Sequence, residues 1–276
     1  MLMIPKWLTD IRGQVPGGAA LVLGLLPVAA LVLLWSMATQ GAPEERLLGP
    51  TILPSPAEVV ASLNDLVTTA DNENRTLFTH IWISVRRVGL GFLLALAVVL
   101  PLGILMGAFG SVRALFDPVM TASGYIPIAT LVPLTMSWFG LDEIQKVAFL
   151  AMAFGIFLTP MAIKAIDSVP DVYLRTAYTL GASKRQVILR VLVPVALPDI
   201  WHGMRLAFGV GWTYLVLAEV VVKTGGLGDL IDTARRRALS GRVYLVIVII
   251  TMIAWVADLI WNYLAGVLFP YRRSRT

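Results

Sequence analysis

Long stretches of this sequence contain no charged residue, and no other feature constrains the fold as strongly. Residues 13–43, 88–112, 118–141 and 147–163 are free of Asp, Glu, Lys and Arg. Two further apolar stretches, 206–222 and 243–270, each contain one carboxylate, Glu219 and Asp258. A helix of about 17–25 apolar residues crosses the hydrocarbon core of a bilayer. The sequence therefore predicts six membrane spans.

Spans of this length restrict the fold class. Lipid offers no partner to backbone N–H and C=O groups, so a spanning segment is a helix unless it belongs to a closed barrel, and the alternating pattern of barrel strands is absent here. Charged residues make up 14% of the chain, against about 25% in soluble domains. We therefore expect an all-α membrane protein that forms one domain over residues 1–276. Gly103 and Gly107 form a GxxxG pattern that favours close helix packing within it.

A basic stretch, RTAYTLGASKRQVILRVLVPVALP at residues 175–198, separates the fourth and fifth spans. Gly181 allows a sharp turn, and Ser183 is a good N-cap for a following helix. Four apolar residues share one face of that helix, namely Val187, Ile188, Val191 and Leu192. The sequence predicts a short helix–turn–helix whose apolar face packs on the bundle, on lipid or on another protein. Pro194 and Pro198 are expected to end the second helix.

This stretch resembles the EAA loop of permease subunits of ATP-binding-cassette (ABC) importers, which reads E-A-A, three residues, Gly, nine residues, I-x-L-P. The spacing is kept, whereas Arg175 and Thr176 replace the first two letters of the pattern. In that family the loop, here at about residues 167–200, faces the cytoplasm and docks into a groove of the ATPase. The residues that the resemblance assigns to coupling are Arg175, Thr176, Ala177, Gly181, Ala182, Ser183, Val187, Ile188, Val191 and Pro194.

Other stretches extend the resemblance to the branch that imports nitrate, sulfonates, taurine and bicarbonate. They are Leu53-Pro54-Ser55-Pro56 with Glu58-Val59; Ser84, Arg87 and Gly91; Asp117-Pro118, Pro127, Pro133-Leu134 and Trp138-Phe139-Gly140; Ala218-Glu219; and Gly226-Leu227-Gly228. The resemblance implies a six-helix, type I (MetI-like) permease bundle in the bacterial cytoplasmic (inner) membrane. Such a permease translocates a small solute by alternating access, and we expect an anion such as nitrate, bicarbonate or a sulfonate.

The resemblance also implies the partners. A second copy of the permease, two ABC ATPase subunits and a periplasmic or lipid-anchored solute-binding protein are expected, together with membrane lipids and no nucleic acid. The permease itself would be non-catalytic and bind no cofactor or metal, because ATP and Mg belong to the ATPases. Lys and Arg residues divide almost evenly between the two sides of the predicted spans. The cytoplasmic position of both termini therefore follows from the resemblance.

Polar residues within and between the spans suggest further sites. Possible liners of a pathway along spans three to five are Thr130, Thr135, Trp212, Thr213, Tyr214 and Glu219, although ordinary helix packing explains any one of them. Glu219 either takes part in gating or pairs with Lys223 at i+4, and Asp258 is expected to find a donor inside the bundle. Arg235, Arg236, Arg237 and Arg242 lie in the predicted outer loop. They either attract an anion or an acidic protein surface, or pair with acidic residues of segment 40–87.

Two other functions compete with that of a permease. Residues 226–229, Gly-Leu-Gly-Asp, spell the GxGD of intramembrane aspartyl proteases, but such catalysis needs a second nearby carboxylate, and no Tyr-Asp dipeptide precedes it. A stand-alone secondary transporter commonly shows internal repeats, and this chain has none. There is no cysteine, which excludes disulfides and thiol chemistry, and no GxxxxGK[ST] phosphate loop.

Overall fold

The computed structural model describes residue 13 and residues 15–42, 46, 48–69, 71, 74–221 and 224–271. Within these ranges every regular element is helical. Five helices are long and apolar enough to cross a membrane, and a bent helix pair forms a sixth span. The predicted all-α fold with six spans is confirmed. Several charges used to weigh the orientation lie outside the described residues, namely Lys6, Arg12, Glu44, Glu45, Glu73, Lys223, Arg272, Arg273 and Arg275.

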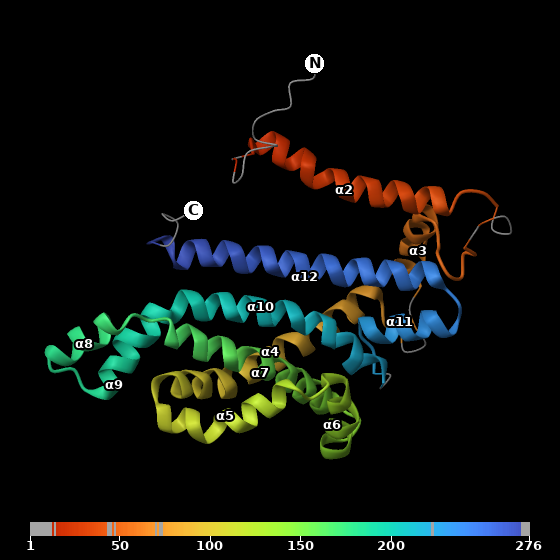
Figure 1. Ribbon diagram of the computed structural model, residues 1–276. Coiled ribbons are helices and arrows are strands. Elements are labelled where there is room, and N and C mark those ends of the chain that lie inside the picture. The colour runs from red at the N-terminus through yellow and green to blue at the C-terminus, as the bar shows by residue number, and fades with distance from the viewer. Residues whose placement is uncertain are drawn as a thin grey trace.

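The long helices run along one common direction, with short helices at both ends of the bundle (Figure 1). Their order is α2 (Gly17–Ala38), α3 (Pro56–Thr68), α4 (Leu77–Ala108), α5 (Gly110–Gly124), η1 (Ile128–Thr130), α6 (Leu131–Phe139) and α7 (Glu143–Asp167). They continue with α8 (Asp171–Thr179), α9 (Lys184–Val187), η2 (Ile188–Leu192), α10 (Val193–Val220), α11 (Leu227–Arg236) and α12 (Ser240–Leu268). α8 and α9 lie at one end of the bundle and α3 and α11 at the other (Figure 1).

Helices α4 and α7 form the scaffold of the bundle and run parallel to each other. A Cβ added to Gly103 would lie 2.7 Å from Cβ of Ala162, and one added to Gly107 would lie 2.7 Å from Cβ of Ile166. The partner follows each glycine by the same 59 residues, which is the constant offset of a parallel pair in register. The predicted GxxxG packing face is confirmed, because only glycine leaves room for this approach.

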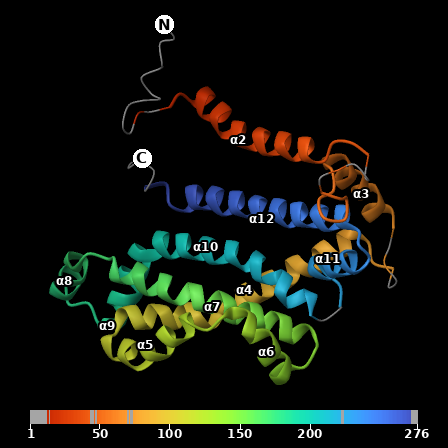
Figure 2. The same ribbon diagram turned by 45° about the vertical axis from the view of Figure 1, so that its right-hand side comes forward.

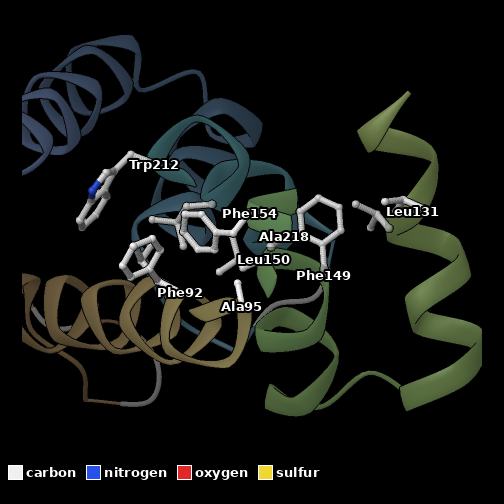
Figure 3. Close-up of a cluster of buried hydrophobic side chains, with 11 residues drawn as sticks. Phe92, Ala95, Leu131, Phe149, Leu150, Phe154, Trp212 and Ala218 are labelled. Carbon is white, nitrogen blue, oxygen red and sulfur yellow. The ribbon is translucent and has the colours of Figure 1, made fainter. Parts of the chain in front are cut away.

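An aromatic core joins α4, α7, α10 and α12. The ring of Phe92 contacts those of Phe154 and Phe208 edge-on, at centroid distances of 5.2 and 5.0 Å, and that of Trp261 at 5.9 Å. Figure 3 shows Phe92, Phe154 and Leu150 converging between the helices, with Trp212 at one side of the cluster. Edge-to-face pairs of this kind are favourable beyond the area they bury.

The first span stands apart from this core. α2 lies on the far side of α12 from α10 in both views (Figures 1 and 2). Its C-terminal end is attached where the indole N–H of Trp35 donates to the carbonyl of Pro54 at 2.9 Å. The following helix, α3, begins with a capping box between Ser55 and Glu58.

The third span is broken. α5 and the continuous segment Ile128–Phe139 meet at an angle of 93°. The three residues between them, 125–127, contain Pro127, whose lack of an N–H interrupts helical bonding. Tyr125 at this break is 84% exposed. Irregular backbone at membrane depth is tolerated where protein covers it or where it lines a water-filled cavity, so this break requires one of these two surroundings.

Candidate functional site

The EAA-like stretch folds as the predicted helix–turn–helix. α8 ends at Gly181, whose φ is +79°, and the N–H of Ala182 reaches back to the carbonyl of Ala177 at 3.0 Å. This is the left-handed glycine stop expected at a helix C-terminus. Ser183 then caps α9, and the side chain of Gln186 accepts from its backbone N–H at 2.8 Å. Local sequence signals therefore fix this hairpin.

The apolar face of the second helix packs on the chain itself. Val187 is 1% exposed and lies in a cluster with Ile166, Ala196 and Ile200, and Ile188 and Val191 pack against the same cluster. Of the three surfaces that the sequence left open, the structure selects the base of the bundle. The apolar side chains that remain exposed in this region belong to α8, the turn and η2, namely Val172, Tyr173, Tyr178, Leu180 and Leu189.

The expectation that Pro194 and Pro198 end the second helix is wrong. α9 continues through the π-helical turn Ile188–Leu192 into α10, and both prolines lie inside the resulting 37-residue helix Lys184–Val220. Pro194 falls in the first turn of α10, and the wider π-helical spacing just before it relieves the bonding pattern that proline would otherwise interrupt. The hairpin is therefore continuous with the fifth span.

A buried polar network lies at the opposite end of the bundle, around Arg87 of α4. The Arg87 side chain is fully buried and donates from Nη1 to Glu219 of α10 at 2.8 Å and from Nε to Glu143 of α7 at 2.9 Å. It also donates to the carbonyl of Gly225 at 2.6 Å and to the hydroxyl of Thr224 at 2.9 Å. One guanidinium thus joins three spans and the connector that follows α10.

Glu219 is the second centre of this network. Its carboxylate is fully buried and accepts from the hydroxyl of Ser84 at 2.8 Å and from the backbone N–H of Gly228 at 2.8 Å, in addition to Arg87. The alternative pairing with Lys223 lies outside the described residues. A buried carboxylate needs this many donors, because an unpaired charge in the interior is very costly.

The connector between α10 and α11 is shaped by the same groups. The N–H of Gly226 donates to Nδ1 of His80 at 3.0 Å, and the N–H of Leu227 donates to the hydroxyl of Ser84 at 2.8 Å. Gly226 has φ +112°, and a Cβ there would lie 2.3 Å from a carboxylate oxygen of Glu219. Gly226 therefore precedes α11 in a sharp turn against Glu219, Leu227 and Gly228 begin the helix, and Asp229 lies in its first turn. Nothing in this arrangement supports the protease reading.

Arg87 and Lys146 lie outside the charge-free stretches of the sequence, yet both are buried within the spanning helices α4 and α7. Lys146 of α7 has a fully buried side chain that contacts the hydroxyl of Thr224 and lies 4.0 Å from Glu143. Together with Arg87, Glu143 and Glu219 it forms a set of two positive and two negative groups. The charge-free stretches of the sequence give no sign of this set, because its members can lie within the membrane only when they are paired. Ser84, Arg87, Ala218-Glu219 and Gly226-Leu227-Gly228, all stretches that carry the family resemblance, meet here.

Asp258 has the donor that the sequence predicted. Arg205 of α10 binds its carboxylate from α12 with two bonds, Nε to Oδ1 at 2.6 Å and Nη2 to Oδ2 at 2.8 Å, and Asn262 adds a third at 3.2 Å. Arg205 was expected in the loop before the fifth span and instead lies well inside α10. A bidentate pair of this kind fixes how two helices sit against each other.

The arginines of the α11 region have different acidic partners, and only one of these partners lies in segment 40–87. Arg235 and Arg236 are mostly exposed and bind Asp232 of their own helix at 2.9 and 2.7 Å. The hydrogen bond from Arg235, and then that from Arg236, lowers the pKa of Asp232. Arg242 pairs with Asp65 of α3 at 3.2 Å, as the structural alternative predicted. An anion-attracting role of the exposed guanidinium groups stays a prediction.

The predicted pathway residues occupy varied positions, and their role in transport stays a prediction. Thr135 is fully buried and accepts from Gln145 at 2.9 Å, Thr130 bonds the carbonyl of Pro127, and Tyr214 stacks on Phe157. Thr213 is exposed. Trp212 is buried, and its indole N–H has no hydrogen-bond partner within the described part of the chain. No cluster of three or more His, Asp or Glu that could hold a metal occurs in that part either.

Comparisons with known proteins agree with this architecture. Residues 99–273 match the family described as binding-protein-dependent transport system inner membrane component. The chain is 33% identical over 254 residues to the taurine transport system permease protein TauC of Escherichia coli, covering 92% of this chain and 89% of the relative. It is 30% identical over 254 residues to the putative aliphatic sulfonates transport permease protein SsuC of Bacillus subtilis, covering 91% and 88%.

A solved structure supports the fold independently. The inward-facing MetNI methionine ABC transporter superposes with a TM-score of 0.63 at 17% sequence identity, over 69% of this chain and 95% of that chain. This likeness concerns the fold alone. The family match covers more than half of the sequence, and the relatives align over nearly all of it. The chain therefore belongs to the binding-protein-dependent inner membrane components, the permease subunits of ABC importers.

Proposed function

We propose that this permease imports a small organic sulfonate and that its α8–α9 hairpin faces the cytoplasm and couples transport to ATP hydrolysis. The observation that carries the coupling role is the hairpin itself. Its tip exposes Leu180 and Tyr178, which are 82% and 51% exposed, next to the exposed Arg175. Large apolar side chains beside a basic group at the end of a bundle suit a protein contact better than water.

The continuous helix Lys184–Val220 gives the hairpin a mechanical role. A displacement imposed on the hairpin moves α10 as one body, because α9, η2 and α10 share one helical backbone. The partners in this proposal are a second copy of the permease, forming a C2 homodimer, and two ABC ATPases that bind ATP and Mg²⁺. The hairpins would dock in the ATPases, and closure of the ATPases on ATP would switch the permease from inward- to outward-facing.

The solute class follows from the names of the relatives. One is a taurine permease and the other a putative aliphatic sulfonate permease, and both solutes carry a sulfonate. A solute-binding protein would deliver the sulfonate to the outer mouth, at the α3 and α11 end. The pathway would run between the two permease copies, along spans three to five. Nitrate and bicarbonate stay possible solutes of the wider branch, as predicted from the sequence.

Orientation is tested by labelling single cysteines in a chain that has none of its own. Lys184→Cys on the hairpin and Arg236→Cys on α11 both place the thiol at exposed positions. In intact spheroplasts an impermeant maleimide should label Arg236→Cys at once and Lys184→Cys only after permeabilisation. Equal labelling of both before permeabilisation would contradict the proposed topology.

The transport role is tested in proteoliposomes that contain the permease, its ATPase and its binding protein. ATP-dependent accumulation of labelled taurine or ethanesulfonate is expected, and nitrate should not compete. Leu180→Asp should abolish both accumulation and co-purification of the ATPase. Lys184→Gln, a neighbouring exposed position, is the matched control and should retain both. Accumulation of nitrate in place of either sulfonate would contradict the proposed solute.

A further inference from the structure

A cleft between α5 and α7 is lined by four charged groups, of which only two form an ion pair with each other. It encloses about 530 Å³, and its lining includes Arg113 and Asp117 of α5 and Lys164 and Asp167 of α7. The apolar groove of about 460 Å³ farther along the same helices has no charged lining residue. Charge is therefore confined to the part of this face that lies toward the α8–α9 hairpin, since Asp167 ends α7 just before α8 begins.

Two of the four charges neutralise each other and two do not. Nη1 of Arg113 lies 2.7 Å from Oδ2 of Asp167, which fastens the start of α5 to the end of α7. Lys164 and Asp117 form no ion pair with any other residue in the described ranges. The cleft thus presents one unpaired ammonium and one unpaired carboxylate on facing helices. Both side chains are exposed and lie just outside the charge-free stretches 118–141 and 147–163, so this part of the cleft is accessible to water.

The broken third span gives a second reason to regard the cleft as aqueous. Gly124 and Tyr125, where α5 stops, line the same cleft. The chain itself leaves Tyr125 84% exposed, and irregular backbone cannot face lipid without losing its hydrogen-bond partners. The C-terminal end of α5 carries partial negative charge. This end and Asp117 favour an ammonium group, and Lys164 favours an oxyanion.

We propose that this cleft is a low-affinity site on the cytoplasmic half of the pathway for a zwitterionic aminosulfonate, with Lys164 binding the sulfonate and Asp117 the ammonium. The assignment rests on the proposed function for its orientation and narrows the solute class from sulfonates to aminosulfonates. A simple anion would leave Asp117 as a repulsive group at the site. An ammonium two carbons from the sulfonate makes the same carboxylate attractive.

The experiment uses Thr121→Cys, at an exposed lining position of the cleft, in inside-out vesicles. Its rates of reaction with a negatively charged and a positively charged methanethiosulfonate are compared. Lys164→Gln should lower the negative-to-positive rate ratio by about fivefold, the effect of one unit charge at about 4 Å across water. Lys164→Arg should restore the ratio. Lys184→Gln, which removes a lysine outside the cleft, should leave it unchanged.

Ligand recognition is read from the same cysteine. Millimolar taurine should protect Thr121→Cys more strongly than ethanesulfonate, which has no ammonium, and Asp117→Asn should remove that difference. The proposal is overturned if taurine and ethanesulfonate protect the thiol equally, or if Lys164→Gln leaves the negative-to-positive rate ratio unchanged. A thiol inert to both reagents while Lys184→Cys reacts would show that lipid or a second copy covers the cleft, which also overturns it. If neither sulfonate accumulates in proteoliposomes that contain the wild-type importer, the proposed function is refuted instead. The cysteine reactions do not test that function.

Discussion

Removing the carboxylate of Glu219 should destabilise the permease more than removing any exposed ion-pair partner. Glu219→Ala leaves the two buried cations of the network, Arg87 and Lys146, with one of its two glutamates, Glu143. It also strands the backbone N–H of Gly228 that Glu219 accepts from. Breaking a buried ion pair from one side costs about 3–5 kcal/mol. Neutral hydrogen bonds between membrane helices average only about 0.6 kcal/mol, so the uncompensated charge dominates the loss.

The matched control is Asp65→Ala in α3, outside the spans. It breaks the pair with Arg242 at 3.2 Å, but the side chain of Asp65 is 64% exposed, so water replaces the lost partner. Exposed pairs contribute about 0–1 kcal/mol, and a difference of about 2 kcal/mol or more between the variants is expected. The free energy of unfolding is measured by SDS titration in mixed micelles, followed by fluorescence of the eight tryptophans.

A double variant separates charge balance from packing. Arg87→Met with Glu219→Gln removes one charge of each sign and leaves Glu143 opposite Lys146. The double variant should lose less free energy of unfolding than either single variant, because replacing a whole buried ion pair is often neutral. A coupling free energy of up to about 3 kcal/mol is expected from the double-mutant cycle. Strictly additive losses, or a Glu219→Ala effect equal to that of Asp65→Ala, would refute this account of the network.

Four further substitutions have expected outcomes. Gly226→Ala should destabilise the same network by strain, since its Cβ would lie 2.3 Å from the carboxylate of Glu219 at a φ of +112°, and SDS titration should report it. Gly103→Leu should force α4 from α7 and cost about 1–3 kcal/mol by overpacking, measured in the same way. Val187→Asp should lower the stability of the isolated permease, because Val187 is 1% exposed. Leu180→Asp should leave that stability unchanged and weaken ATPase association in a pull-down.

The spans and the hairpin could be predicted from the sequence because their signals are local. Absence of charge over about 20 residues is sufficient to indicate a span. Gly181 and Ser183 determine a turn and a cap within three residues of themselves. The surface against which the apolar face around Val187 packs was not predictable, because it depends on how the hairpin meets α7 and α10. Whether a proline ends a helix was not predictable either, since the π-helical turn before Pro194 accommodates it.

The buried network escaped the sequence analysis for a different reason. Arg87 and Glu219 are 132 residues apart, and each reads in isolation as a charge that belongs near a membrane surface. Only the fold brings them together with Lys146 and Glu143. The residues that carry the resemblance are visible in the sequence, but their spacing contains no information about one another. The structural role of Ser84, for example, depends on the two groups that it bonds, Glu219 and the N–H of Leu227.

The position of Glu219 connects the network to the hairpin through one element. Helix Lys184–Val220 has 37 residues, about 55 Å at 1.5 Å per residue, and carries the hairpin at one end and Glu219 at the other. Its C-terminal end is fastened to α4 and α7 through Arg87, and its N-terminal end through the cluster around Val187. Because α10 is attached at both ends to the α4–α7 scaffold, a push on the hairpin should move these three helices together. Relative motion within one subunit is then left to the broken third span, which borders the charged cleft.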